Sequence, residues 1–149
     1  MENNFEKEMT ELQIDMIDIC NEYCEGLADT IYIYISYEGM LTACHFYKIN
    51  NKIVRAAKLN DALPSKQTPF DVSDEFQEKV LDILMDDVEK IKKLCDFHKK
   101  KMPTEFRIVY DAKGEKMNAE YKYDKQFKKN MGILDIVDAW FDEEKEKNE

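Results

Sequence analysis

The chain is poor in glycine, proline, histidine and tryptophan: its 149 residues include four Gly, three Pro, two His and one Trp. So little glycine and proline excludes a collagen-like repeat. The glycines stand alone at Gly26, Gly39, Gly114 and Gly132. Phosphate-binding loops need closely spaced glycines at the start of a helix, so nucleotide binding by either common loop is not expected.

Long hydrophobic runs are also missing. The longest uncharged apolar stretch, residues 30–37, is far shorter than the roughly 20 residues that cross a bilayer. The chain does not open with a basic, then apolar, then small-residue leader. We therefore expect a cytoplasmic protein without membrane contacts. Its four cysteines are expected to be free thiols, because the cytosol is reducing and a chain of this size can bury a core without disulfides.

Basic residues are outnumbered: 22 Lys and Arg stand against 32 Asp and Glu, a net charge of −10. Proteins that bind DNA or RNA use Lys and Arg to replace counterions on phosphate, so direct nucleic-acid binding is not expected. The excess lies at the two ends. Residues 1–39 carry ten acidic residues and one basic residue, whereas residues 40–67 carry one and five. This distribution favours a basic partner, or serves solubility alone.

Residues 5–27 have apolar side chains three and four positions apart, which predicts an amphipathic helix. The acidic residues of this segment fall on a narrow opposite arc: Glu8, Glu11, Asp15, Asp18, Glu22 and Glu25. Ile14 lies among them, as an interface anchor would. Closely spaced like charges repel one another along a helix. The stripe is therefore either a solvated face or a docking surface for a cationic protein.

Residues 30–37, 41–49 and 52–59 alternate as β-strands and predict an antiparallel meander, followed by a loop at residues 60–69. Ser73 is a natural N-cap for a second long helix that stops before residues 102–103. Asp87 lies on the apolar side of this helix. We expect it at the edge of that side, reaching solvent or a cation such as Arg55 or Arg107.

Residues 105–110 and 117–123 predict a hairpin around a glycine turn, and residues 133–141 predict a short helix. The acidic end, residues 142–149, has nothing left to bury and is expected to fray. The element order predicts one α+β domain over residues 1–149. A mainly antiparallel sheet, made of the meander and the C-terminal hairpin, packs against two long helices and the short C-terminal helix. The pattern does not determine the strand order.

Catalytic and metal-binding chemistry has little support in the sequence. The chain has only two histidines, and His45 is interpreted as a satisfied strand residue. Two pairs have the spacing of metal ligands on one helix face: Cys20 with Cys24, and Cys95 with His98. Core packing explains these pairs, because no close CxxC motif is present. We predict no catalytic residue, metal or cofactor. A small enzyme is an alternative, and it would bring Asp87, His45 and thiols into one pocket.

The order of these elements and their residue patterns resemble those of the YezG-type family of bacterial immunity proteins, which are antitoxins of secreted nuclease toxins. The resemblance covers most of the chain. It is carried by the acidic first helix, the aromatic run CHFY at residues 44–47, the helix start DVSDEF at residues 71–76, and the hairpin at residues 106–123 with its Tyr-x-Tyr end. It implies a protein that binds its cognate toxin in the cytosol and keeps the toxin off nucleic acid.

The charge pattern and this resemblance together predict the partner-binding residues. Glu11, Asp15, Asp18 and Glu22 would meet the basic surface of the toxin, and Ile14 would anchor the contact. The acidic segment at residues 142–146 is the second choice. The alternative function is an acidic adaptor or regulatory protein that docks on another basic protein.

Overall fold

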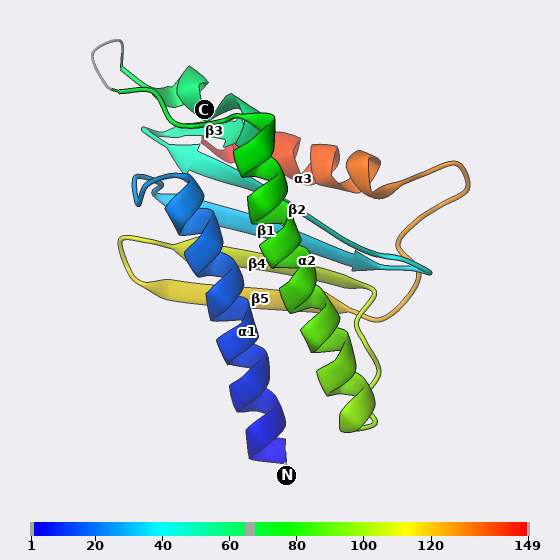
Figure 1. The fold of residues 1–149 in the computed structure, drawn as a ribbon. Helices are drawn as coiled ribbons and strands as arrows, with labels where there is room; N and C mark the ends of the chain where they lie inside the picture. Colours follow the sequence, from blue (N-terminus) through cyan, green and yellow to red (C-terminus); the bar gives the residue numbers. More distant parts are fainter. Residues whose placement is uncertain (1, 65–67, 149) are drawn as a thin grey trace.

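The computed structural model describes residues 2–64 and 68–148 (Figure 1). Its elements, in chain order, are the helix α1 (Glu2–Tyr23), the strands β1 (Thr30–Tyr37), β2 (Leu41–Ile49) and β3 (Lys52–Arg55), the 3-10 helix η1 (Ala56–Ala62), the helix α2 (Asp74–Phe97), the strands β4 (Glu105–Asp111) and β5 (Lys116–Lys122), and the helix α3 (Ile133–Lys147). This arrangement confirms the predicted α+β class. Within these residues, no helix has both the length and the apolar character needed to cross a bilayer.

The five strands form one antiparallel sheet in the order β3-β2-β1-β4-β5. The strand β1 is therefore central and joins the meander to the second hairpin. Ile33 of β1 lies opposite His45 of β2 on one side and Ile108 of β4 on the other. Residues 31–36 are all buried, because successive side chains of β1 point to opposite faces and a helix layer covers each face.

The helices α1 and α2 cross one face of the sheet side by side, and α3 covers the opposite face (Figure 1). The core beneath α1 and α2 is rich in aliphatic residues. Its fully buried members include Ile31, Ile33 and Ile35 of β1 and Val80, Leu84, Val88 and Ile91 of α2. The apolar stripe predicted for α2 is thus the side that is buried in this core.

An aromatic cluster fills the space between the sheet and α3. Tyr32 stacks on Phe46 with ring centroids 4.5 Å apart, and Trp140 of α3 meets Phe46 edge-on at 5.1 Å. Val137 and Phe141 of α3 belong to the same cluster. Tyr32 and Tyr34 of β1 therefore pack against α3 rather than form an exposed aromatic surface.

The strand β3 is shorter than predicted: it ends at Arg55, and η1 takes the place of its second half. Tyr23 of α1 stabilises this turn, because its hydroxyl donates a hydrogen bond to the carbonyl oxygen of Ala56 at 2.6 Å. The side-chain amide of Asn50 donates to the carbonyl oxygen of Ala62 at 2.8 Å. Contacts between segments distant in sequence thus overrode the local strand pattern.

The helix α1 ends at Tyr23, earlier than predicted. Glu25 and Gly26 adopt positive φ angles of 54° and 70°. Gly26 donates its N–H to the carbonyl oxygen of Asn21 at 2.9 Å. Left-handed residues of this kind reverse the chain and close a helix. The apolar residue Leu27, which the periodicity placed in the helix, is 47% exposed beyond this turn.

The helix α3 continues through residues predicted to fray. It ends at Lys147, and Glu149 lies outside the described residues. Trp140 and Phe141 hold the helix against the sheet, and two basic residues, Lys145 and Lys147, occupy its last turn. Cations at a helix C-terminus interact favourably with the helix dipole, so residues 142–147 remain helical although they bury little.

Candidate functional site

The five predicted partner-binding residues all lie exposed on α1: Glu11, Ile14, Asp15, Asp18 and Glu22. We call them the acidic face. The opposite side of α1 is held in the core, where Met16, Cys20 and Tyr23 are fully buried. Because these core contacts determine how α1 is rotated, its acidic residues face outward. Ile14 is 46% exposed, as an apolar anchor for a partner requires.

The lysines and arginines of this protein do not neutralise the acidic face. None of its carboxylates forms an ion pair within the described part of the chain. On the neighbouring helix α2, Lys90 pairs with Asp86 at 3.0 Å and Lys92 pairs with Asp96. Lys90 and Lys93 of α2 line the groove beside Glu11 and Asp15 but form no ion pair with them, so the row of like charges on α1 is only partly offset.

A groove separates α1 from α2, and part of the acidic face lines it. Glu11 and Asp15 of α1 and Asp87 of α2 contribute carboxylates to this α1–α2 groove. Its other lining residues are Glu8, Leu12, Lys90, Lys93, Leu94 and Phe97. The remaining three residues of the acidic face are exposed outside the groove. The structure thus divides the acidic face between an outer surface and a cleft.

Asp87 is the buried carboxylate of this groove. It is only 2% exposed, and no N–H or hydroxyl group in the described part of the chain donates to its Oδ2 atom. Burial raises the pKa of Asp87, and the Asp15 carboxylate raises it further, to about 7. Lys90 lowers this pKa only in part, since its ammonium group pairs with Asp86. Protonated and ionised forms of Asp87 therefore coexist near neutral pH.

The expectation that Asp87 reaches solvent or a cation such as Arg55 or Arg107 is wrong. Arg55 pairs with Asp138, and Arg107 lies beside Glu105 on the opposite face of the sheet. The position of Asp87 within the apolar stripe of α2 was a correct signal of burial. The pattern could not indicate that α1 would cover it with another carboxylate.

His45 is a satisfied strand histidine, as predicted, and it is partly buried. Its Nδ1 lies 2.6 Å from the hydroxyl oxygen of Tyr47, and the ring of Tyr23 meets it edge-on at 5.7 Å. Burial lowers the pKa of His45 to about 4, so the ring is neutral near pH 7. His45 and Cys44 line a different groove from Asp87. The groups that a small enzyme would combine are therefore not brought into one pocket.

The four cysteines are free thiols. Burial raises the pKa of Cys20 to about 12 and also raises the pKa values of Cys24, Cys44 and Cys95. Thiols that keep their proton are poor nucleophiles and poor metal ligands. Across residues 2–64 and 68–148, no three His, Cys, Asp or Glu side chains are placed to hold a metal ion.

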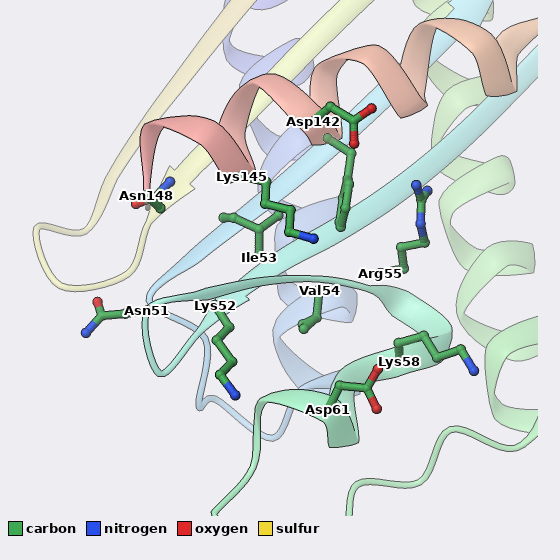
Figure 2. Close-up of a pocket in the computed structure, with 11 residues that line it drawn as sticks. Asn51, Lys52, Ile53, Val54, Arg55, Lys58, Asp61, Asp142, Lys145 and Asn148 are labelled. Atoms are coloured by element: carbon green, nitrogen blue, oxygen red, sulfur yellow. The ribbon is translucent and has the colours of Figure 1, made fainter.

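A second groove runs along β3, between η1 and α3 (Figure 2). Its charged lining residues are Lys52, Arg55, Lys58, Asp61, Asp142 and Lys145. Arg55 is engaged internally: its Nη1 lies 2.7 Å from Asp138, and its guanidinium lies 4.2 Å from the ring centroid of Phe141. The basic excess of residues 40–67 is visible in the sequence, but the groove is not, because α3 completes it from a distant part of the chain.

Glu105 of β4 is a second buried carboxylate that sequence analysis missed. It is 2% exposed, and the hydroxyl of Tyr34 donates a hydrogen bond to its Oε1 at 2.7 Å. Its Oε2 lies 3.5 Å from Nε of Arg107 and 3.6 Å from Nζ of Lys122. Glu105 is thus partnered within the fold, on the face of the sheet that α3 covers.

No protein-family model and no curated protein matches the sequence. The candidate site therefore rests on its own geometry: an outward row of carboxylates on α1, and the α1–α2 groove beside it.

Proposed function

We propose that this protein is an immunity protein, an antitoxin that binds and neutralises a cognate secreted bacterial toxin, a nuclease. It acts in the cytosol of the cell that produces the toxin. It works by occlusion, since it covers the basic surface with which the toxin would hold nucleic acid. The observation that carries the proposal is the acidic face of α1, which is exposed and whose carboxylates form no ion pair among the described residues.

Electrostatics supports this mode of binding. A nuclease presents lysines and arginines along the path of the nucleic-acid backbone, and a row of carboxylates can occupy that surface as a substitute polyanion. The spacing of Asp15, Asp18 and Glu22 places the carboxylates about one helical turn apart. Ile14 lies among them and supplies an apolar contact that loses water on docking. Charge complementarity then speeds association and selects the partner.

The test is co-expression in a bacterial host with the large protein that the adjoining reading frame is expected to encode. The native protein should restore growth and inhibit the nuclease activity of that partner. The double variant Asp15→Lys with Asp18→Lys should lose protection, because two attractive charges become repulsive. We expect its association rate, measured by surface plasmon resonance, to fall by about tenfold or more.

Two further double variants make the test specific. Asp82→Lys with Glu89→Lys changes the charge equally at exposed positions of α2 outside the groove and should retain protection. Glu143→Lys with Glu146→Lys reverses the acidic segment of α3; a loss of protection confined to this pair would move the interface to the C-terminal helix. Unchanged protection by the α1 variant contradicts the proposed surface. Tight binding without inhibition favours the adaptor alternative instead.

A further inference from the structure

The α1–α2 groove contains a buried carboxyl group, Asp87, whose hydrogen-bonding neighbour is another carboxyl group, that of Asp15. Asp87 lines the groove with 2% of its surface exposed, and no N–H or hydroxyl group of the described residues donates to its Oδ2. Buried polar groups in native proteins are nearly always hydrogen-bonded, and buried charges are nearly always paired. This exception points to a group that binds in the groove.

The cations of α2 do not meet this need. Lys90 lines the groove but pairs with Asp86 at 3.0 Å, and Lys93 forms no ion pair with Asp87. The charged groups that face Asp87 or line the groove beside it are Glu8, Glu11 and Asp15 of α1 and Asp86, Lys90 and Lys93 of α2. Carboxylates outnumber ammonium groups, so the groove attracts a further positive charge.

The rest of the lining is apolar. Leu12 of α1 and Leu94 and Phe97 of α2 form this part of the groove, and Phe97 is 81% exposed although it is a large aromatic residue. A ligand for this groove therefore combines an apolar stem with a cationic head. Arginine has both, and its planar guanidinium can bridge two carboxylates and stack on an aromatic ring.

We propose that the α1–α2 groove binds one arginine side chain of the partner, with its guanidinium at Asp15 and Asp87 and its methylene groups against Leu12, Leu94 and Phe97. The inference rests on the proposed function, because the arginine belongs to the basic surface of the toxin. It adds to that function a pocket for one particular arginine, which is distinct from the long-range attraction between the acidic face and the basic surface of the toxin.

Binding of arginine releases a proton. In the free protein at neutral pH, Asp87 is partly protonated, because its pKa is about 7. When the guanidinium enters, the O–H bond of the Asp87 carboxyl group breaks and the proton passes to solvent. No other covalent bond in the protein or the arginine changes. The positive charge of the arginine takes the place of the proton. Linkage then requires the affinity to fall by about tenfold for each pH unit below the pKa of Asp87.

The experiment uses the full chain, labelled with 15N and 13C, and the blocked tripeptide acetyl-Gly-Arg-Gly-amide. Titration at pH 8, followed by NMR, should give saturable shifts at Asp87, Leu94 and Phe97. Repetition at pH 6 should give an affinity about tenfold lower, as the linkage requires. The matched peptide with citrulline in place of arginine has the same shape without the charge and should not bind.

Variants locate the site. Asp87→Asn and Asp15→Asn should each abolish the saturable shifts. Both variants are used, so that the experiment still gives a result if one of them fails to fold. Asp82→Asn on α2 and Glu6→Gln on α1 remove exposed acids that lie outside both the groove and the acidic face, and they should leave binding unchanged. Equal binding of the citrulline peptide, or retained binding in both groove variants, overturns the proposal. Because no toxin is used, either result leaves the test of the immunity function intact.

Discussion

Glu105 and Asp87 are buried to the same extent, each 2% exposed, but their surroundings are opposite. Glu105 lies beneath α3 with a tyrosine hydroxyl at 2.7 Å and the cations of Arg107 and Lys122 within 3.6 Å. Asp87 meets the carboxylate of Asp15 in the α1–α2 groove, and no N–H or hydroxyl group of the described residues donates to its Oδ2. Glu105 has a hydroxyl donor and two cations, although Nε of Arg107 forms no hydrogen bond among the described residues. Asp87 has only another carboxyl group beside its buried oxygen.

This difference separates a structural carboxylate from a functional candidate. A buried carboxylate with good partners can be retained because its removal would leave those partners unpaired. A buried carboxylate without partners destabilises the free protein, so its burial is best explained by a state in which it gains a partner. The two residues therefore predict opposite effects of mutation on stability.

The largest effect is expected from Glu105→Ala. The substitution leaves the buried hydroxyl of Tyr34 without its acceptor and the partly buried Arg107 without its anion. We expect a loss of about 3 kcal/mol in the free energy of unfolding, measured with urea at pH 7. The exposed control Glu143→Ala should change this free energy by no more than about 0.5 kcal/mol. Similar results for the two variants would remove the structural role assigned to Glu105.

The opposite effect is expected from Asp87→Asn. The pKa of Asp87 is about 7 in the folded protein, above the ordinary value of about 3.9. The folded state therefore holds a proton that the unfolded chain has released, so the native protein loses stability as pH rises from about 4 to 7. Asparagine does not titrate and should avoid this loss. We expect a gain of about 1 to 3 kcal/mol at pH 8 and little gain at pH 4.

Thermal unfolding of both proteins at pH 4, 6 and 8 measures this gain. The exposed control Asp82→Asn should follow the pH dependence of the native protein. If Asp87→Asn is less stable than the native protein at pH 8, Asp87 is partnered after all and the contrast with Glu105 fails.

A smaller effect is expected from Asp15→Asn. After burial, Asp15 is the next cause of the raised pKa of Asp87, so its neutralisation should lower that pKa toward the ordinary value. The gain in stability at pH 8 should be about 0.5 to 1 kcal/mol. An NMR titration of the Asp87 side-chain carboxyl carbon measures the shift directly. Asp18→Asn, outside the groove, should leave it unchanged; equal shifts in the two variants would mean that Asp15 has no special relation to Asp87.

Local patterns predicted much of the fold. The bounds of β1 and β2 agree with prediction, because alternation of side chains is a property of each strand alone. The N-cap of α2 was also predicted: the hydroxyl of Ser73 accepts a hydrogen bond from the N–H of Phe76 at 3.3 Å. The candidate residues of α1 are exposed as expected, since the apolar residues on the opposite side of the helix determine which side is buried.

Predictions failed where a distant segment decided the outcome. The strand β3 stops at Arg55 because Tyr23 holds the turn that follows it, through a hydrogen bond to Ala56, 33 positions further along the chain. The sequence indicated that Asp87 is an acidic residue within an apolar stripe, but the predicted contact with solvent or with an arginine was wrong. The pKa of a carboxylate depends on what covers it, and that element lies elsewhere in the chain.

Taken alone, the sequence determined the elements, the side of each helix that is buried and the row of carboxylates that faces outward, because these follow from periodicities a few residues long. Only the tertiary structure decided that β1 is central, that α1 and α2 lie side by side and that Asp15 meets Asp87 in a groove. Such contacts depend on how segments far apart in the chain pack together, which no local pattern records.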